Sequence, residues 1–157
     1  MNPENIVISP ASSNDIGDIQ LLFRKMFEIY HVDQNIEYPY TDSRISYLKH
    51  CVQDQIALVA KANEVTVGFI TGGVEDTLLF KTYRQHGHIH NLFVLEEYRR
   101  QGIGKSLIQQ FIQRCKESDV HRIITDSDDI ETLRHFYASI GFLVTSVNYE
   151  LDTSNRV

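Results

Sequence analysis

The chain has 157 residues, of which 42% are hydrophobic and 23% are charged, and its formal net charge is −6 at pH 7. This length suits one domain that buries a core without disulfides or a structural metal, so we interpret residues 1–157 as a single domain. The negative charge argues against a nucleic-acid partner, because such binding depends on clustered Lys and Arg side chains.

The sequence contains no apolar run of membrane-span length and no signal-peptide pattern at its start, which predicts a cytoplasmic protein without a membrane partner. Its two cysteines, Cys51 and Cys115, both fall on apolar helical stripes. This position favours buried, reduced thiols over a redox or catalytic role.

The first elements in chain order are predicted to be a strand and a helix. Residues 6–9 form a short apolar run that Pro10 stops, as expected for a strand. Ser13 and Asn14 are cap candidates for the helix that follows. From residue 16 to residue 30 apolar side chains recur at a spacing of three to four, so this helix buries one face.

The stretch from His31 to Tyr40 breaks the helical pattern and is rich in aromatic and acidic residues. A second helix is predicted to begin at Thr41 or Asp42 and to include Val52. Loops of this composition often face a ligand, because an acidic side chain attracts an amine and an aromatic ring holds a cation. A solvated loop with packed tyrosines explains the same composition equally well.

A hairpin is predicted next, with strands at residues 55–62 and 65–73 in which Val, Ile and Thr are frequent. Asn63 and Glu64 form the tight turn between these strands. Residues 75–84 are largely polar and are interpreted as a connection to the following strand.

The next predicted strand spans residues 87–94 and has the period of two that is typical of extended chain. Its side chains fall into two alternating sets, His88, His90, Leu92 and Val94 against Ile89, Asn91 and Phe93. One face of the strand therefore carries both histidines, about 7 Å apart.

A glycine-containing turn then leads into a helix. Gly102 and Gly104 flank Ile103, where an apolar stripe of helical period begins and continues to Cys115. The first turn of a helix offers backbone N–H groups without intrahelical partners at the positive end of its dipole, and glycine lets an anion approach them. Arg99, Arg100 and Lys105 add positive charge in an otherwise acidic chain. The turn is therefore predicted to bind phosphate.

Two other phosphate motifs do not fit this turn. The nucleotide-hydrolase loop requires four residues between its glycines before Lys-Ser or Lys-Thr, and only the Lys105-Ser106 part is present. The dinucleotide fingerprint requires a third glycine where Leu107 stands.

The last third is predicted to contain a strand at residues 122–125 and a helix with cap candidates at residues 126–129. The apolar stripe of this helix runs from Ile130 to Ile140, and Gly141 ends it. Residues 142–151 are predicted to return as a strand.

Two of these segments resemble motifs of the GNAT N-acetyltransferase superfamily. The sequence Arg-x-x-Gly-x-Gly at residues 99–104, after a strand that ends Leu-x-Val at residues 92–94, resembles its acyl-CoA binding motif. The sequence Phe-Tyr-x-x-x-Gly-Phe at residues 136–142 resembles its second motif. The resemblance implies an α/β (α+β) GNAT fold, with a mixed, mostly antiparallel sheet of about six to seven strands flanked by about four helices.

The resemblance also implies acetyl-CoA as cosubstrate. The amides of the glycine turn would hold its pyrophosphate, and the preceding strand would offer backbone groups to its pantetheine arm. The residues that this assigns to the cofactor are Leu92, Phe93, Val94, Arg99, Arg100, Gln101, Gly102, Ile103, Gly104 and Lys105.

Catalysis requires a base, because an alkylamine with a pKa of about 10.4 is almost fully protonated at neutral pH. His88 and His90 are candidates, and His-x-His at this place resembles the arylalkylamine (serotonin) N-acetyltransferases of the superfamily. The second motif implies Tyr137 as the acid that protonates the thiolate. Ordinary strand histidines and a core tyrosine are the alternatives. No metal is expected, since zinc needs three or four ligands and His86 has no suitable spacing as a third.

The predicted function is therefore transfer of an acetyl group from acetyl-CoA to a primary amine, with a small-molecule amine as partner. A protein lysine or N-terminal acetyltransferase, or a non-catalytic acyl-CoA sensor, is the alternative. Two departures affect the sites. Ile130 stands where the superfamily often has Asn, which affects one polar contact near the cofactor. The segment after Phe142 is short, so the acceptor pocket is expected to be shallower, altered at its rim or completed by a second subunit of a homodimer.

Overall fold

The structure is a computed structural model that describes residues 5–30, 42–79, 82–127 and 131–145. Its backbone groups into two compact units, Met1–Asp126 and Ser127–Val157. The predicted loop from residue 31 to residue 40 lies outside the described residues, and so does Ile130.

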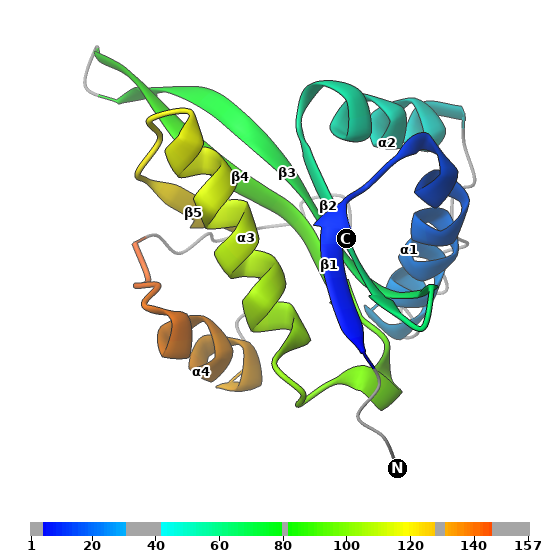
Figure 1. The fold of residues 1–157 in the computed structure, drawn as a ribbon. Helices are drawn as coiled ribbons and strands as arrows, with labels where there is room; N and C mark the ends of the chain where they lie inside the picture. Colours follow the sequence, from blue (N-terminus) through cyan, green and yellow to red (C-terminus); the bar gives the residue numbers. More distant parts are fainter. Residues whose placement is uncertain (1–4, 31–41, 80–81, 128–130, 146–157) are drawn as a thin grey trace, which may run out of the picture. The chain divides into compact units, whose positions relative to one another are not determined.

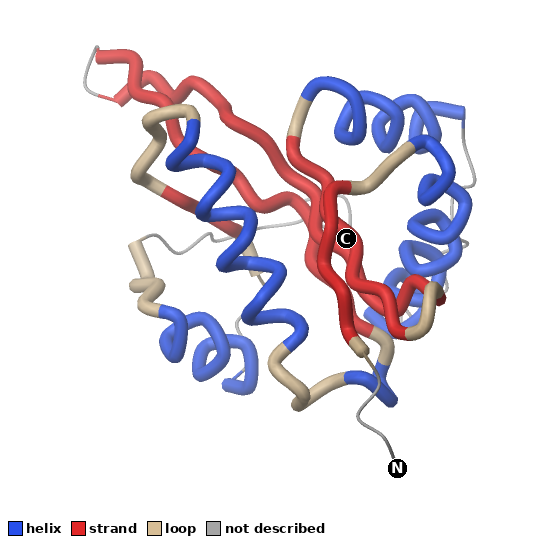
Figure 2. Tube along the Cα trace, viewed as in Figure 1, coloured by secondary structure: helices blue, strands red, loops and turns tan. Residues whose placement is uncertain are grey.

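The first unit is built on one sheet in the order β1-β2-β3-β4-β5. The first four strands pair antiparallel with their neighbours, and β5 runs parallel to β4, so the predicted mixed, mostly antiparallel sheet is confirmed (Figures 1 and 2). The strands are β1 (Ile6–Pro10), β2 (Ile56–Ala62), β3 (Val65–Leu79), β4 (Thr82–Val94) and β5 (Ile123–Thr125).

The third and fourth strands are longer than the sequence predicts. Residues 75–79 continue β3 and residues 82–86 continue β4, with pairs from Glu75 opposite His86 to Leu79 opposite Thr82. The interpretation of residues 75–84 as a connection is therefore wrong. Their polar composition does not indicate a strand, because pairing between strands satisfies the backbone N–H and C=O groups whichever side chains are present.

Helices flank this sheet on opposite faces, with α1 and α2 on one face and α3 on the other (Figure 1). Short 3-10 turns precede α1 and α3, at Ser13–Asp15 and Glu96–Tyr98. Within the described residues there are four α-helices, the number expected: α1 (Ile16–Tyr30), α2 (Asp42–Asp54), α3 (Ile103–Glu117) and α4 (Glu131–Ile140).

The core under α1 and α2 depends on the apolar stripes that the sequence predicts. Phe23 of α1 packs against Phe69 of β3 with ring centroids 4.9 Å apart, and Phe69 packs in turn against Phe93 of β4 at 6.5 Å. The buried cluster on this face is Ile19, Leu22, Phe23, Leu48, Val59, Phe69 and Phe93.

On the opposite face, α3 lies so close to the sheet that Gly87 has no room for a side chain. A Cβ there would lie 2.5 Å from Cys115 Sγ and 2.8 Å from Ile123 Cδ1. Cys115 and Cys51 are buried and free, as the sequence predicts. Burial raises the pKa of both thiols, that of Cys115 to about 11, so neither is a reactive thiolate at neutral pH.

The C-terminal unit differs from the prediction after its helix. Gly141, at φ 105°, ends α4 as expected. Residues 142–145 then form no strand, and residues 146–151 of the predicted strand lie outside the described residues. Within the described ranges the sheet therefore has five strands, fewer than the six to seven expected.

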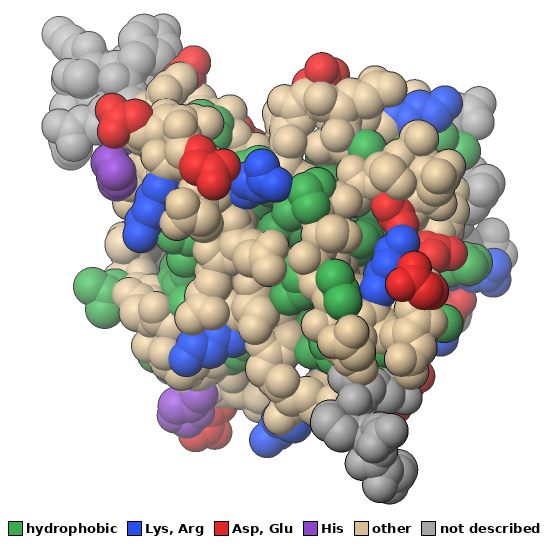
Figure 3. Space-filling model, in the orientation of Figure 1, with side chains coloured by type: hydrophobic (Ala, Val, Ile, Leu, Met, Phe, Trp, Pro, Cys, Tyr) green, Lys and Arg blue, Asp and Glu red, His purple; other side chains and the backbone are tan. Residues whose placement is uncertain are grey.

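Charges on the face drawn in Figure 3 are mixed. Lys and Arg side chains of the described residues are scattered there among Asp and Glu side chains instead of forming one broad patch.

None of the helices that the structure describes combines the length and apolarity needed to cross a membrane.

The junction of β1 and α1 is held by a buried carboxylate, Asp15, which is 5% exposed. It accepts hydrogen bonds from the Ser12 backbone at 2.7 Å and the Ser12 hydroxyl at 2.8 Å, and it pairs with Lys61 Nζ at 2.7 Å. Burial by itself raises the pKa of Asp15, but the hydrogen bonds from Lys61 and Ser12 outweigh burial and hold it below the usual value.

Replacing this carboxylate tests its contribution to stability. Asp15→Asn is expected to lower the free energy of unfolding by about 1–3 kcal/mol at pH 7, because charge-assisted bonds to a buried group are lost. The loss is measured by urea unfolding. Since the folded-state pKa of Asp15 is depressed, the difference should persist above the unfolded value of about 3.9 and vanish as the pH falls through the lower folded value.

The control for this comparison is Glu28→Gln, which removes an exposed pair with Arg24 on α1 and should change stability by less than about 0.5 kcal/mol. Equal effects of the two substitutions, or a difference between the parent and Asp15→Asn that does not depend on pH, would contradict the assignment.

Candidate active site

A β-bulge on β4 shapes the site. Thr71 of β3 lies opposite Asn91, but the next residue, Gly72, lies opposite Ile89, so His90 is the extra residue of the bulge. The side chains of His90 and Asn91 consequently leave the strand on the same side, and both reach the hydroxyl of Tyr47 on α2.

The bulge corrects one part of the predicted alternation. The face that carries both histidines is confirmed, because His88 and His90 contact the same carboxylate. Phe93, however, belongs to the core under α1 and α2, on the side of His90. Leu92 and Val94 therefore point to the face opposite the histidines, since alternation resumes after the bulge.

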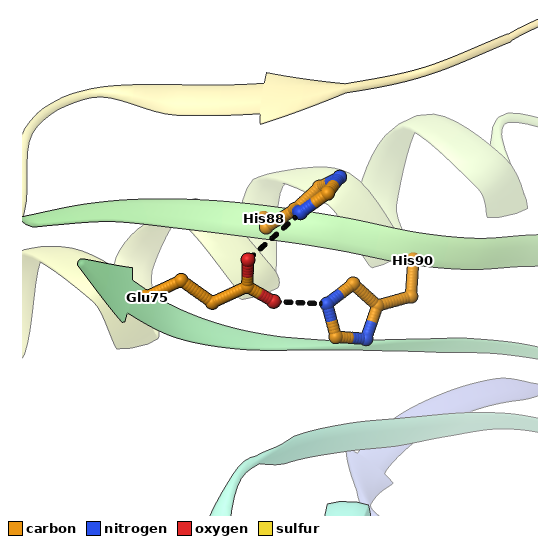
Figure 4. A group of neighbouring side chains, drawn as sticks. All are labelled: Glu75, His88 and His90. Carbon is orange, nitrogen blue, oxygen red and sulfur yellow. Dashed lines mark hydrogen bonds and ion pairs between the residues drawn. The ribbon is translucent and has the colours of Figure 1, made fainter. Parts of the chain in front are cut away.

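Glu75 of β3 is the centre of the site (Figure 4). Its Oε2 lies 3.0 Å from His88 Nδ1, and its Oε1 lies 2.5 Å from His90 Nε2. The two imidazole rings meet edge to face with centroids 4.9 Å apart. His86, which is 3% exposed, has its Nε2 3.9 Å from Glu75 Oε2. One carboxylate thus gathers three histidines of one strand.

The far side of each catalytic candidate is also occupied. His88 Nε2 lies 3.3 Å from Asp126 Oδ2, just after β5, and His90 Nδ1 lies 3.0 Å from the Tyr47 hydroxyl. Asn91 donates from its amide to Tyr47 at 3.2 Å and to Thr71 at 3.0 Å. The polar contacts form a continuous chain from Thr71 to Asp126 through the site.

The charge state of Glu75 follows from its neighbours. Burial alone raises the pKa of this carboxyl, but hydrogen bonds from His90 and His88 outweigh burial and hold the pKa below its usual value. Glu75 is therefore ionised near neutral pH and only accepts hydrogen bonds. Its contacts require N–H on His88 Nδ1 and on His90 Nε2.

Tyr47 completes the assignment of hydrogens. Burial raises the pKa of its hydroxyl, which therefore stays a neutral phenol. With its Nε2 proton directed at Glu75, neutral His90 presents a lone pair on Nδ1, and the Tyr47 hydroxyl donates to it. Both nitrogens of His90 are thus engaged, whereas His88 Nε2 lies beside the exposed Asp126 carboxylate, which cannot donate a hydrogen bond to it.

The predicted anion-binding turn has the geometry that its glycine suggests. Gly102 stands at the N-terminus of α3 with φ 81°, and a Cβ there would meet nothing within 4 Å. Arg100 before it also has positive φ, 64°. The turn is therefore open to a ligand, and the restriction on residue 102 is its backbone conformation.

Arg99 connects this turn to the end of β4. Its Nε donates to the Val94 carbonyl at 2.9 Å, and its guanidinium lies 5.5 Å from the centroid of the Phe93 ring. The Gln101 amide similarly donates to the Glu97 carbonyl at 3.3 Å. Two of the predicted cofactor residues thus use side-chain donors to hold the turn in place.

The backbone of β4 presents an edge next to this turn. Leu95 N–H donates to the Val67 carbonyl, so the alternation of antiparallel bonds directs the groups of Phe93 toward β3 and those of Leu92 and Val94 away from it. On that other side, β5 pairs only with Gly87–Ile89. Among the described strands, none pairs with β4 there beyond Ile89.

Tyr137 lies in the C-terminal unit, on α4. Its ring packs against Phe136 and Phe142 with centroid distances of 5.2 and 5.5 Å. Its predicted role as an acid stays a prediction.

Sequence reasoning missed Glu75, Tyr47 and Asp126. Glu75 lies in a polar stretch that the sequence predicts to be a connection, Tyr47 lies on the second predicted helix, and Asp126 is a cap candidate. Continuing the hairpin register back from the histidines would have placed Glu75 opposite His86. Tyr47 and Asp126 come from elements distant in sequence, and no local pattern points to them.

Comparisons with known proteins identify the family. The sequence profile of the acetyltransferase (GNAT) family matches residues 22–142. Human N-acetyltransferase 8 is 30% identical over 121 residues, which are 76% of this chain and 51% of that protein. The chain belongs to the GNAT acetyltransferase family, as its motifs predict, and spans about half the length of the curated relative that it matches.

Solved structures agree with the fold. An aminoglycoside N-acetyltransferase, AAC(6')-Iy, in complex with CoA has a TM-score of 0.76 at 17% identity, covering 98% of this chain and 97% of that one. A predicted acetyltransferase with acetyl-CoA from Clostridium acetobutylicum has a TM-score of 0.74 at 19% identity, covering 94% and 96%. These likenesses show that the chain has the fold of these two acetyltransferases.

The tautomers that Glu75 imposes can be measured. In chelator-treated protein, long-range ¹H–¹⁵N spectra at a pH where the rings are neutral should show the proton of His88 on Nδ1 and that of His90 on Nε2. Glu75→Ala should abolish the Nδ1 preference of His88. His50, whose Nδ1 lies 3.1 Å from Asp54 in an exposed pair, serves as the control and should not change. A neutral His88 with its proton on Nε2 in the parent would contradict the hydrogen assignment.

Proposed function

We propose that this protein transfers the acetyl group of acetyl-CoA to the primary amine of a small molecule by direct attack of the amine on the thioester. The observation that carries the proposal is the Glu75–His88–His90 cluster at the point where, among the described strands, the pairing of β4 with β5 ends. Membership of the family supports acetyl transfer, and this cluster provides side chains suited to the proton transfer that the reaction requires.

The cofactor path follows from the strand and the turn. The N–H groups at the start of α3, behind Gly102, suit the pyrophosphate, because they lie at the positive end of the helix dipole. From there the pantetheine arm would run along the β4 edge and bond to the backbone groups of Val94 and Leu92 that point away from β3. Continuing in the same direction, the thioester would reach the vicinity of His90.

His88 is the better of the two base candidates. Glu75 holds a proton on its Nδ1, so Nε2, beside Asp126, carries the lone pair that accepts the proton of the amine. The imidazolium that forms would then donate to both Glu75 and Asp126. His90 has both nitrogens engaged and positions Glu75. The two carboxylates also favour a cationic amine near the site.

The finer parts of the proposal rest on supporting observations. An aminoglycoside N-acetyltransferase among the structural neighbours supports a small-molecule amine over a protein amine as acceptor. We retain Tyr137 as the acid that protonates the departing thiolate, on the strength of its place in the second motif. The Leu92 amide, which points away from β3, is the candidate for the oxyanion contact, whereas the Phe93 amide, the other sequence candidate, is directed at β3.

The cofactor assignment is tested by Gly102→Asp. This substitution forces an acidic side chain into a φ of 81° and brings negative charge to the phosphates, so the affinity for CoA should fall at least about tenfold in calorimetry. Gly17→Asp is the matched control, since Gly17 also has open space but lies in α1 without positive φ. Equal affinities of the two variants would defeat the assignment of the turn.

The function itself is tested by thiol release from acetyl-CoA with a panel of amines that spans polyamines, arylalkylamines, aminoglycosides and lysine peptides. Amine-stimulated release with a small molecule supports the proposal. Release with lysine peptides alone would make the chain a protein acetyltransferase. Binding of acetyl-CoA without any release would make it a sensor.

On the best amine, His88→Gln should lower kcat/KM by about 10²-fold or more, because the proton acceptor is lost. The control is His121→Gln, which alters an exposed His–Asp pair with Asp119 and should leave the rate unchanged. A His88→Gln variant as fast as the parent would assign the base elsewhere.

A further inference from the structure

The site contains a second possibility that acetyl transfer does not require. Glu75, His88 and His90 each offer one ligand atom for a metal ion, and these atoms all lie within 4.8 Å of one another. All three side chains are partly buried, with exposed fractions of 36%, 22% and 23%. Two imidazoles and one carboxylate are a ligand set that zinc and related divalent transition metals accept.

The surroundings of the two histidines match those of metal ligands. A histidine that binds a metal through one nitrogen is usually held by a hydrogen bond to the other. Here the nitrogens that face away from Glu75 both have partners, Asp126 for His88 at 3.3 Å and the Tyr47 hydroxyl for His90 at 3.0 Å. Asp126 and Tyr47 thus hold the two rings in place, and the other ring nitrogens, His88 Nδ1 and His90 Nε2, point at the Glu75 carboxylate.

The positions of the protons on His88 give a second reason to expect a metal ion. With a proton on Nδ1 for Glu75, neutral His88 presents the Nε2 lone pair to the Asp126 carboxylate, so that two acceptors face each other. A metal ion in place of the protons that face Glu75 removes this conflict. His88 Nε2–H then donates to Asp126, and His90 Nδ1–H donates to Tyr47. A doubly protonated His88 is the other arrangement that satisfies both carboxylates.

We propose that Glu75, His88 and His90 form a binding site for one divalent transition-metal ion of the zinc class. The ion is bound by His88 Nδ1, His90 Nε2 and a Glu75 oxygen, and its fourth position is open to water or to an amine. The sequence did not suggest this site, because the third ligand comes from the neighbouring strand, opposite His86 in the hairpin register.

Metal binding also regulates the reaction, a consequence that rests on the proposed function. An imidazole bound to a metal through Nδ1 carries its proton on Nε2 and gives that proton to Asp126. His88 then has no lone pair left for the proton of the amine. Occupation of the site by zinc therefore inhibits acetyl transfer, and a chelator restores it.

The test is calorimetric titration of the chelator-treated full chain with Zn²⁺, repeated with Co²⁺ and read by its visible absorption. One ion per chain with a tetrahedral Co²⁺ spectrum is expected. Glu75→Gln and His90→Gln should each weaken binding at least about tenfold, and Asp126→Asn, which affects only the support of His88, should weaken it less than these. His50→Gln is the matched control, because His50 and Asp54 offer a comparable but exposed His–Asp pair on α2, and its affinity should equal that of the parent.

Circular dichroism and CoA affinity of each variant exclude misfolding as the cause of a loss. The proposal is overturned if the parent binds no ion, or if Glu75→Gln and His90→Gln bind it as tightly as the parent. Zinc binding without inhibition would retain the site and refute the role of His88 as base. An absence of amine-stimulated thiol release in metal-free protein would refute the proposed function and leave the binding result standing.

Discussion

The pairing of β3 with β4, interrupted by one bulge, is the constraint on which the site depends. The long register brings Glu75 beside histidines that follow it by thirteen and fifteen residues. The extra residue, His90, turns two successive side chains toward α2, where Tyr47 holds them. Without the bulge, Asn91 would point to the opposite face. A local irregularity of one strand thus builds a polar centre beside a closely packed core.

Glu75 is the residue that links the two histidines of this centre. Its carboxylate is shared by two imidazoles, so the tautomer of each ring is set by the same group. That arrangement leaves His88 Nε2 as the available proton acceptor, next to Asp126. The same three ligand atoms suit a metal ion, and the two uses exclude each other, because each requires a different distribution of protons over His88.

Much of the fold follows from periodicity. The apolar stripes predict α1 and α3 closely, and the glycine turn predicts the start of α3 because few residues other than glycine adopt φ 81° readily. The paired histidines also follow from alternation. The polar extension of β3 through Glu75 does not follow from periodicity, since it depends on backbone pairing. Tyr47 and Asp126 reach the site from distant elements, and their contacts are tertiary facts that no window of sequence contains.

The glycine turn, the β4 edge and the Glu75 cluster should act as one site, and a crystal structure with bound CoA tests this most directly. In that structure the pyrophosphate should accept hydrogen bonds from the amides of residues 103–105, and the pantetheine should bond to Leu92 and Val94. The sulfur should then lie beside His88 and His90. A cofactor that runs in the opposite direction, or whose sulfur lies away from this cluster, would show that the three parts do not form one site.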